Sequence, residues 1–268
     1  MGIYADLIHY RELFGNLFRR DLRTKYKGSV LGVLWSLVNP LILLGIYTLV
    51  FSVLFRVSRV PHYPLYLLSG LAIWVFVSGA LAASSRSLLD NANLIKKVRF
   101  PRQLAPFSTV ATHLVSLFAI LVVLIPLNFA VIPAARDTVW LALPLAVPIV
   151  ALVAGLGLAI AAATILFRDV EHIVAAILLP WFFLTPIMYS FTAGGPLATG
   201  IDEHHTLVQI LRYGNPITPP IEAVHDALYW GRLPRLSDVI YLVVAAAVAL
   251  GVGAFVFRRV DDRIAVEL

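Results

Sequence analysis

The sequence predicts an all-α integral membrane protein that crosses the bilayer six times. Hydrophobic residues make up 60% of the 268 residues and charged residues 13%, whereas soluble domains have about 45–50% and about 25%. Six apolar stretches are long enough to cross a hydrocarbon core of about 30 Å as helices. Lys and Arg cluster in alternate connections between these stretches, as expected when cytoplasmic loops retain the positive charge.

The first 27 residues are predicted to form an amphipathic helix in the headgroup layer. Apolar residues recur at steps of three and four and share one helical face: Ile3, Leu7, Tyr10, Phe14, Leu17 and Phe18. Because Asp6, Glu12 and Asp21 precede the first apolar stretch, this segment is not a signal peptide. Two roles for the polar face stay open, namely docking of a cytosolic partner and plain attachment to lipid.

The first predicted span, residues 29–55, follows a cluster of positive charge. The cluster consists of Arg19, Arg20, Arg23, Lys25 and Lys27, and the next 28 residues carry no charge. A stretch of this length crosses the bilayer with some tilt. Since Lys and Arg stay on the cytoplasmic side, the chain enters the membrane from within.

Five further apolar stretches give the remaining spans. They cover residues 65–85, 105–132, 139–167, 173–192 and 239–257. With this topology 15 of the 21 Lys and Arg residues are cytoplasmic, as are both termini, while residues 194–238 lie outside. Pro40 in the first span and Pro180 and Pro186 in the fifth each remove a backbone hydrogen bond. We therefore expect these two spans to be kinked and to face protein or a pathway.

A short amphipathic helix, residues 93–102, is predicted in the cytoplasmic loop between the second and third spans. Asn93 is suited to cap its N-terminus, and Pro101 should end it at Phe100. Three cations near its C-terminal end are favourable against the helix dipole: Lys96, Lys97 and Arg99. A second, compact cytoplasmic turn covers residues 168–172.

Residues 204–230, on the outer side, are predicted to contain short helices. Pro219 and Pro220 can begin a helix, because the first turn does not need their missing amides, and Gly231 can end it. An apolar stripe runs along this helix through Ile221, Val224 and Leu228. Such a segment lies on the membrane surface or re-enters it.

The predicted spans contain no Asp, Glu, Lys or Arg, which argues against a proton- or sodium-driven transporter. His113 is the one ionisable residue clearly within a span, and a packing role is favoured over proton transfer. The chain also has no GxxxxGK[ST] loop to bind ATP in that manner, so a separate subunit must power any pump. The net charge is +6, and most of the Lys and Arg residues flank the apolar stretches. This position predicts contact with membrane lipid rather than with nucleic acid.

A membrane enzyme is the alternative from another class, and it rests on the outer segment. That segment groups acids and histidines that resemble metal ligands: Asp202, Glu203, His204, His205, Glu222, His225 and Asp226. Their spacing matches neither HExxH nor another metal motif, so a solvated loop is the favoured interpretation and no metal or catalytic residue is predicted. With no Cys, the chain also lacks thiolate ligands and a Cys nucleophile.

Six blocks of this sequence resemble ABC-2-type polysaccharide export permeases, and they occur in the order expected of that family. The blocks are RRDLRTKYKGSVLGVLWSLVNP, NANLIKKVRFPRQLAP, FRDVEHIV, LPWFFLTPIMYS, YGNPITPPIEA and FRRVDDRIAVEL. The resemblance covers nearly the whole chain. It implies a homodimer of six-span permeases that works with two copies of a separate ATPase, which binds ATP and Mg²⁺, and exports lipid-linked polysaccharide across the inner membrane.

The resemblance also implies roles for three segments. The N-terminal helix matches the interface helix of the family, residues 93–102 match its coupling helix, and residues 204–230 match its outer gate segment. The residues then expected at the ATPase are Arg11, Arg19, Lys96, Lys97, Arg99, Phe100, Arg168 and Asp169. O-antigen, teichoic acid, capsule and galactan all fit as the polymer, and an exporter of another amphipathic lipid or a drug remains the alternative.

Aromatic residues are candidates for the substrate pathway, because sugars present apolar C–H faces to aromatic rings. The candidates on the first and fifth spans are Trp35, Tyr47, Phe51, Phe55, Trp181, Phe182, Phe183 and Tyr189. Trp and Tyr also mark the membrane interface, and the sequence does not separate the two roles.

Overall fold

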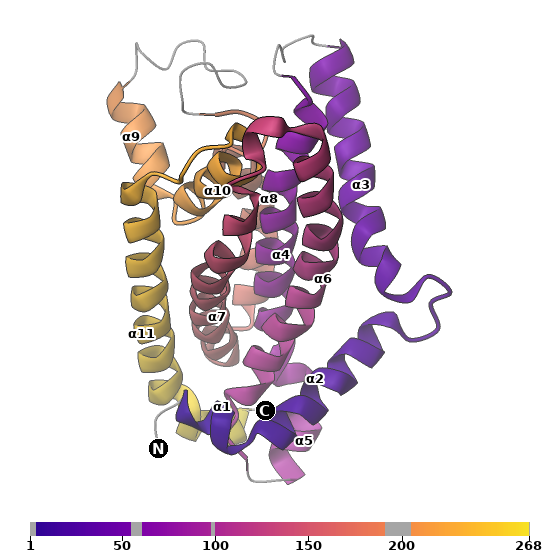
Figure 1. Cartoon of the computed structure of the whole chain (residues 1–268). Helices are drawn as coiled ribbons and strands as arrows, with labels where there is room; N and C mark the ends of the chain where they lie inside the picture. Colours follow the sequence, from indigo (N-terminus) through magenta and orange to yellow (C-terminus); the bar gives the residue numbers. More distant parts are fainter. Residues whose placement is uncertain (1–3, 55–60, 98–99, 191–204, 268) are drawn as a thin grey trace.

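The computed structural model describes residues 4–54, 61–97, 100–190 and 205–267, and every regular element among them is helical (Figure 1). This agrees with the predicted all-α class. Five helical stretches in the described part are long and apolar enough to cross a membrane: Gly32–Phe51, Tyr63–Lys97, Leu104–Val131, Val139–Leu166 and Leu236–Asp262.

A bundle of four long helices forms the body of the molecule: α4 (Tyr63–Asp90), α6 (Leu104–Val131), α7 (Ala142–Leu166) and α11 (Leu236–Glu267). The central helix is α4, which packs against both α6 and α7. Its Tyr66, Leu71 and Phe76 side chains are completely buried. This explains why α4 has apolar residues on all sides rather than a single stripe.

The helices α7 and α11 meet backbone to backbone. A Cβ atom added at Gly155 would lie well within 3.0 Å of the backbone of Ala249, and one added at Gly253 would collide in the same way with the Gly155 carbonyl. Small residues allow this approach, as is common between helices in membranes.

The first predicted span stands at the edge of the bundle (Figure 1). It comprises a 3₁₀ turn at Gly32–Leu34, the helix α3 (Trp35–Tyr47) and a π-helical segment at Thr48–Leu54. About half the surface of Leu41, Ile42 and Ile46 is exposed. α3 therefore presents an apolar face to lipid or to another protein.

The fifth predicted span is shorter than expected. Its helix α8 runs over Asp169–Leu184 instead of residues 173–192, and 16 residues give about 24 Å at 1.5 Å each. Pro186 accounts for the end of the helix, because a proline pushes the preceding residue into extended backbone, and Thr185 has φ −99° and ψ 135°. α8 is shorter than each of the five helical stretches that are long enough to cross a membrane.

The predicted N-terminal helix is divided in two at Tyr10. The first part, α1 (Ala5–His9), is followed by α2 (Arg11–Tyr26), which runs obliquely across the end of the bundle. Leu17 is buried, and Phe14 packs against the small apolar cluster at that end. The end of α11 and the short helix α5 (Ala92–Lys97) lie at the same end (Figure 1).

Three other helix ends differ from expectation, two of them because charged residues can continue a helix beyond its apolar part. α4 extends to Asp90, and α11 continues past Arg258 and Arg259. α5 begins earlier than predicted, since the Leu94 and Ile95 amides donate to the Asn91 carbonyl. Asn93 thus lies inside the first turn and does not cap it. α5 is described as far as Lys97, and the predicted contact residue Arg99 lies outside the described residues.

The opposite end of the molecule carries α9 (His205–Gly214), α10 (Thr218–His225) and a π-helical turn at Asp226–Trp230 (Figure 1). As predicted, prolines occupy the first positions of α10, and Gly231 follows the last turn with φ +64°. The predicted stripe of Ile221, Val224 and Leu228 is buried.

Candidate functional site

Aromatic residues from α3, α4 and α8 form one cluster. The Tyr47 ring stacks on Phe182 with 5.5 Å between centroids and 23° between planes. Trp74 of α4 packs edge to face against both Phe182, at 5.5 Å, and Trp181, at 6.2 Å. The cluster therefore joins α3 and α8, and it includes Trp74, which the sequence did not single out because its neighbours are apolar on every side.

The predicted pathway residues differ in exposure. Phe182 is buried and fills the core, whereas Trp35 and Phe183 keep 52% and 51% of their surface exposed. The half-buried members are Tyr47, Phe51, Trp181 and Tyr189. Phe55 lies outside the described residues. Only the exposed and half-buried rings have faces that a substrate can touch in this conformation.

Trp181 connects this cluster to the outer segment. Its indole Nε1 donates to Asn215 Oδ1 at 2.8 Å, and the Asn215 amide donates to Thr185 Oγ1 at 2.9 Å. Next to this contact, an apolar groove of about 710 Å³ lies between α8 and α9, where Ile177, Leu184 and Ile210 line it. A displacement of α8 must therefore move the turn between α9 and α10.

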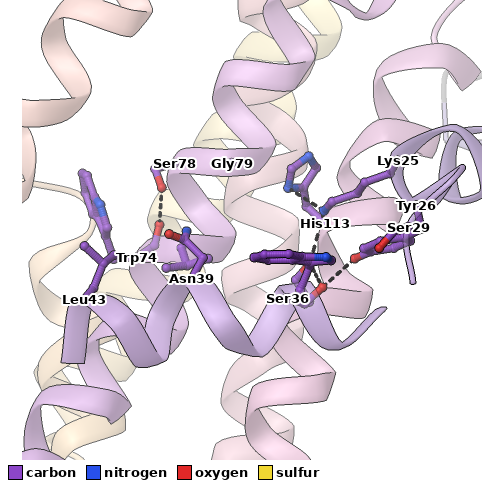
Figure 2. Close-up of a pocket in the computed structure, with 13 residues that line it drawn as sticks. Lys25, Tyr26, Ser29, Ser36, Asn39, Leu43, Trp74, Ser78, Gly79 and His113 are labelled. Atoms are coloured by element: carbon purple, nitrogen blue, oxygen red, sulfur yellow. Dashed lines mark hydrogen bonds between the residues drawn. The ribbon is translucent and has the colours of Figure 1, made fainter. Parts of the chain in front are cut away.

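A cavity of about 450 Å³, lined by apolar surface and several polar side chains, lies between α2, α3, α4 and α6 (Figure 2). It is lined by Lys25, Tyr26, Ser29, Trp35, Ser36, Asn39, Leu43, Trp74, Val75, Ser78, Gly79, His113 and Ser116. The Lys25 ammonium lies 3.2 Å from Ser116 Oγ and 3.5 Å from His113 Nδ1. Partial burial lowers the pKa of Lys25, and Tyr26 opposes this shift. Sequence reasoning gave Lys25 only a topological role, because nothing in its local pattern shows that it meets α6.

The predicted ATPase-contact residues lie on the surface of the end that carries α1, α2 and α5. Six of them are exposed or lie on exposed turns: Arg11, Arg19, Lys96, Lys97, Arg168 and Asp169. Phe100 is only half-buried, and it packs against the apolar cluster of its own chain. Part of the Phe100 ring is thus covered by its own chain and is not available to a partner. A salt bridge of 3.1 Å between Arg86 and Glu171 joins α4 to the start of α8 beside these residues.

The N-terminal helices are bonded to the bundle by polar contacts. The Arg20 guanidinium donates to Asn91 Oδ1 at 2.5 Å, immediately before α5. Asp6 accepts a hydrogen bond of 2.7 Å from Gln103, and Asp21 accepts one from Ser108. The start of α5 and the start of α6 are therefore both held by the same pair of surface helices.

The favoured interpretation of the outer acids and histidine as a solvated loop is wrong for Glu222, His225 and Asp226, which are all buried. Asp202, Glu203 and His204 lie outside the described residues, and the His205 side chain is not described. Each buried group has its own partner. His225 stacks on Tyr66 with 3.9 Å between centroids, and Asp226 pairs with Arg232 at 2.6 Å. They are thus fixed separately, which does not suit a shared metal ion.

Glu222 belongs to a buried ion triad with Arg212 and Asp238. The Arg212 guanidinium lies 2.8 Å from the Glu222 carboxylate and 2.6 Å from that of Asp238. Burial alone would lower the pKa of Arg212, but the two carboxylates outweigh this and raise it. The triad joins α9, α10 and α11. Its members are 10 to 26 residues apart in the chain, so no local sequence motif predicts the triad.

The ionisable groups of the outer segment are held in defined states. Burial lowers the pKa of His225 to about 3, so the imidazole is neutral at pH 7. Burial raises the pKa of Asp226, while the hydrogen bond and charge of Arg232 oppose this shift. Two further bonds tie the segment to the bundle, from Asn128 to the Leu228 carbonyl and from Thr138 to the Ala227 carbonyl. The segment is therefore a packed part of the fold.

The sequence profile described as ABC-2 type transporter matches residues 12–229. An "O-antigen export system permease protein RfbA" of Myxococcus xanthus is 31% identical over 96% of this chain and 95% of that protein. A protein of the same name from Klebsiella pneumoniae is 33% identical over 64% of this chain and 66% of its own length. The "Polysialic acid transport protein KpsM" of Escherichia coli is 24% identical over 92% of both chains.

Proposed function

The chain belongs to the ABC-2 type transporter family, and from this we propose that it is the membrane-spanning permease of an ATP-driven exporter of lipid-linked polysaccharide. The observation that carries the proposal is the similarity to an O-antigen export permease along 96% of the chain. The sequence of this chain has no phosphate-binding loop of its own. A separate ATPase subunit, in two copies, therefore binds ATP and Mg²⁺ and supplies the work.

The proposed assembly is a homodimer of this permease in the inner membrane, with both termini in the cytoplasm. We count α8 as the sixth crossing, in which the short helix is completed by the chain that follows Leu184. The distribution of Lys and Arg supports this orientation. The half-exposed apolar face of α3 offers a surface for the second copy.

We propose that the aromatic residues of α3 and α8 line the polysaccharide path. Trp35 lines the same cavity as Trp74 of α4, and the buried rings of Trp74 and Phe182 connect this cavity to the exposed Phe183 through contacts of 5.5 Å and 5.2 Å between centroids. Aromatic faces can hold the C–H faces of successive sugars without charged groups that would trap each unit. Trp35 and Phe183, which are half exposed, are the members best placed to touch the polymer.

Replacing Trp35 and Phe183 together by alanine is expected to reduce export at least fivefold without loss of folded protein. In inside-out vesicles that contain the permease and its ATPase, export is measured as ATP-dependent protection of lipid-linked polysaccharide from added glycosidase. The matched control is Phe118→Ala with Trp140→Ala, which removes two rings of similar exposure from other elements. Equal export by both double variants would assign the α3 and α8 rings to lipid contact. A wild-type complex that protects no polysaccharide would instead favour another amphipathic lipid or a drug as substrate.

We propose that α5 receives the movement of the ATPase. It directly follows α4, and Arg20 links its start to α2. Lys96 and Lys97 are exposed at its end. A small docking helix of this kind uses such charges for steering and an apolar residue as an anchor. Phe100 supplies that anchor with the part of its ring that its own chain leaves uncovered.

Changing Lys96 and Lys97 together to glutamate is expected to weaken co-purification of the ATPase at least tenfold, because two favourable charge pairs become repulsive. The control is Arg258→Glu with Arg259→Glu, which makes an equal change of charge at the same end of the molecule. We expect the control to retain its ATPase. Wild-type co-purification and wild-type export by the α5 variant would remove these lysines from the coupling mechanism.

A further inference from the structure

The Lys25 cavity lies where the chain passes from the surface helix α2 to α3 (Figure 2). None of the 13 lining residues is acidic, while Lys25 contributes a positive charge and several side chains contribute hydroxyl or amide groups. Asp21, one helical turn before Lys25, is engaged by Arg20 at 2.6 Å and by Ser108. Its carboxylate therefore does not neutralise the ammonium. The cavity suits an anion.

The position of the ammonium is set by α6. Lys25 reaches Ser116 at 3.2 Å and His113 at 3.5 Å. Because an ammonium group can only donate, the Nδ1 atom of His113 acts as the acceptor and its other ring nitrogen carries the proton. Gly79 makes room for this arrangement, since a Cβ there would lie 2.7 Å from His113 Nδ1. The 3.5 Å contact is long, so an incoming anion can replace it.

A chain of hydroxyl groups lies beside the ammonium. Tyr26 and Ser36 share a hydrogen bond of 2.5 Å, and Ser36 lies 3.1 Å from Ser116. Hydroxyl groups rotate and can either donate or accept. Together with Lys25, they can turn donors toward the oxygen atoms of a phosphate, for which charge-assisted hydrogen bonds are strong.

Lys25 can be reached from the cytoplasmic end of the molecule. A second cavity of about 710 Å³ between α2, α4 and α6 shares Lys25 and His113 with the first. Its other lining residues include two arginines, Arg20 and Arg86, each paired with an aspartate of the same lining, Asp21 and Asp90. The Lys25–His113 contact thus separates a space lined by paired arginines and aspartates from a space without acidic residues that contains two tryptophans, Trp35 and Trp74.

We propose that this cavity binds the phosphate of a membrane lipid, with Lys25 as the cation and Ser36 and Ser116 as hydrogen-bonding partners. The tryptophans of the lining, Trp35 and Trp74, can contact a second part of the bound lipid. Trp35 offers an exposed ring face to a sugar joined to that phosphate, and the Asn39 side chain lies beside it in the lining. The assignment of the sugar rests on the proposed function, whereas the phosphate site does not.

The test measures lipid binding to the purified complex of permease and ATPase by native mass spectrometry. Three probes are compared: a lipid diphosphate that carries N-acetylglucosamine, the same lipid diphosphate without sugar, and phosphatidylglycerol. Lys25→Met is expected to weaken the two diphosphates about 10- to 100-fold, the loss expected for one hydrogen bond to a charged group. Lys25→Arg should stay close to wild type. Lys27→Met is the matched control, because Lys27 lies two residues further on and does not line this cavity.

Two further variants separate binding from folding and phosphate from sugar. Ser36→Ala should weaken both diphosphates without removing a charge, which keeps the proposal testable if Lys25→Met does not fold. Trp35→Ala should weaken only the probe that carries sugar. A Lys25-dependent affinity for phosphatidylglycerol alone would support the phosphate site and contradict the polysaccharide substrate. Unchanged binding of all three probes to Lys25→Met and Ser36→Ala would overturn the phosphate site and leave the proposed function standing.

Discussion

Replacing Arg212 by methionine is expected to lower the free energy of unfolding by about 3–5 kcal/mol, the cost of removing one partner of a buried ion pair. The Arg212 side chain is 7% exposed, and those of Glu222 and Asp238 are 6% and 0% exposed. Without the guanidinium, two carboxylates remain together in a site that excludes water. The outer segment should detach from α11 to hydrate them.

The loss is measured as a fall in the midpoint of thermal unfolding of the purified protein and in its amount in membranes. Arg136→Met is the control, because Arg136 lies on an exposed turn, where it donates to the Phe129 carbonyl and its guanidinium lies over the Phe129 ring. We expect this change to alter stability by about 0.5 kcal/mol or less. Adding Glu222→Gln and Asp238→Asn to Arg212→Met should recover most of the loss. A wild-type midpoint for Arg212→Met alone would mean that the triad contributes nothing to stability.

Replacing Gly155 by alanine is expected to destabilise the protein by about 3 kcal/mol or more, at the upper end for overpacked sites. The added methyl group would meet the backbone of Ala249 and Leu250, which cannot rotate away as a side chain can. α7 and α11 must therefore separate along much of their contact. The helix preference of alanine, worth about 1 kcal/mol over glycine, is too small to compensate.

Gly251→Ala provides a matched control in the same helix pair. Nothing lies within 4 Å of a Cβ added at Gly251, so the same substitution should leave stability unchanged or raise it slightly. Thermal unfolding of both variants in one detergent makes the comparison direct. Similar midpoints for the two variants would contradict the close backbone contact.

Local chemistry in the sequence predicted much of the fold. Pro219 and Gly231 marked the ends of the outer helices correctly, and the apolar stretches located the long helices because burial in lipid demands uncharged sequence. The end of α8 at Leu184 was missed although Pro186 was noted. The proline was interpreted as a kink, but the chain leaves the helix at Thr185.

The features that sequence reasoning missed depend on contacts between distant residues. The burial of Glu222 requires Arg212 and Asp238, which lie in other helices. Lys25 was placed with the other positive charges before the first span, since only the angle of α2 across the bundle brings it to His113. Trp74 joined the aromatic cluster through the packing of α4 against α8. The spacing of residues along one helix does not predict which residues of other helices they contact.

The backbone contact between α7 and α11 also decides which parts of the molecule can move during a transport cycle. Helices that interlock through Gly155 and Gly253 cannot slide past each other without collision, so this pair behaves as one rigid body. α3 is attached differently, through side chains such as Tyr47 on Phe182, and much of its surface is free of the bundle. Side-chain contacts of this kind can be exchanged at low cost. α7 and α11 therefore form a rigid pair, against which the more loosely attached α3 can move.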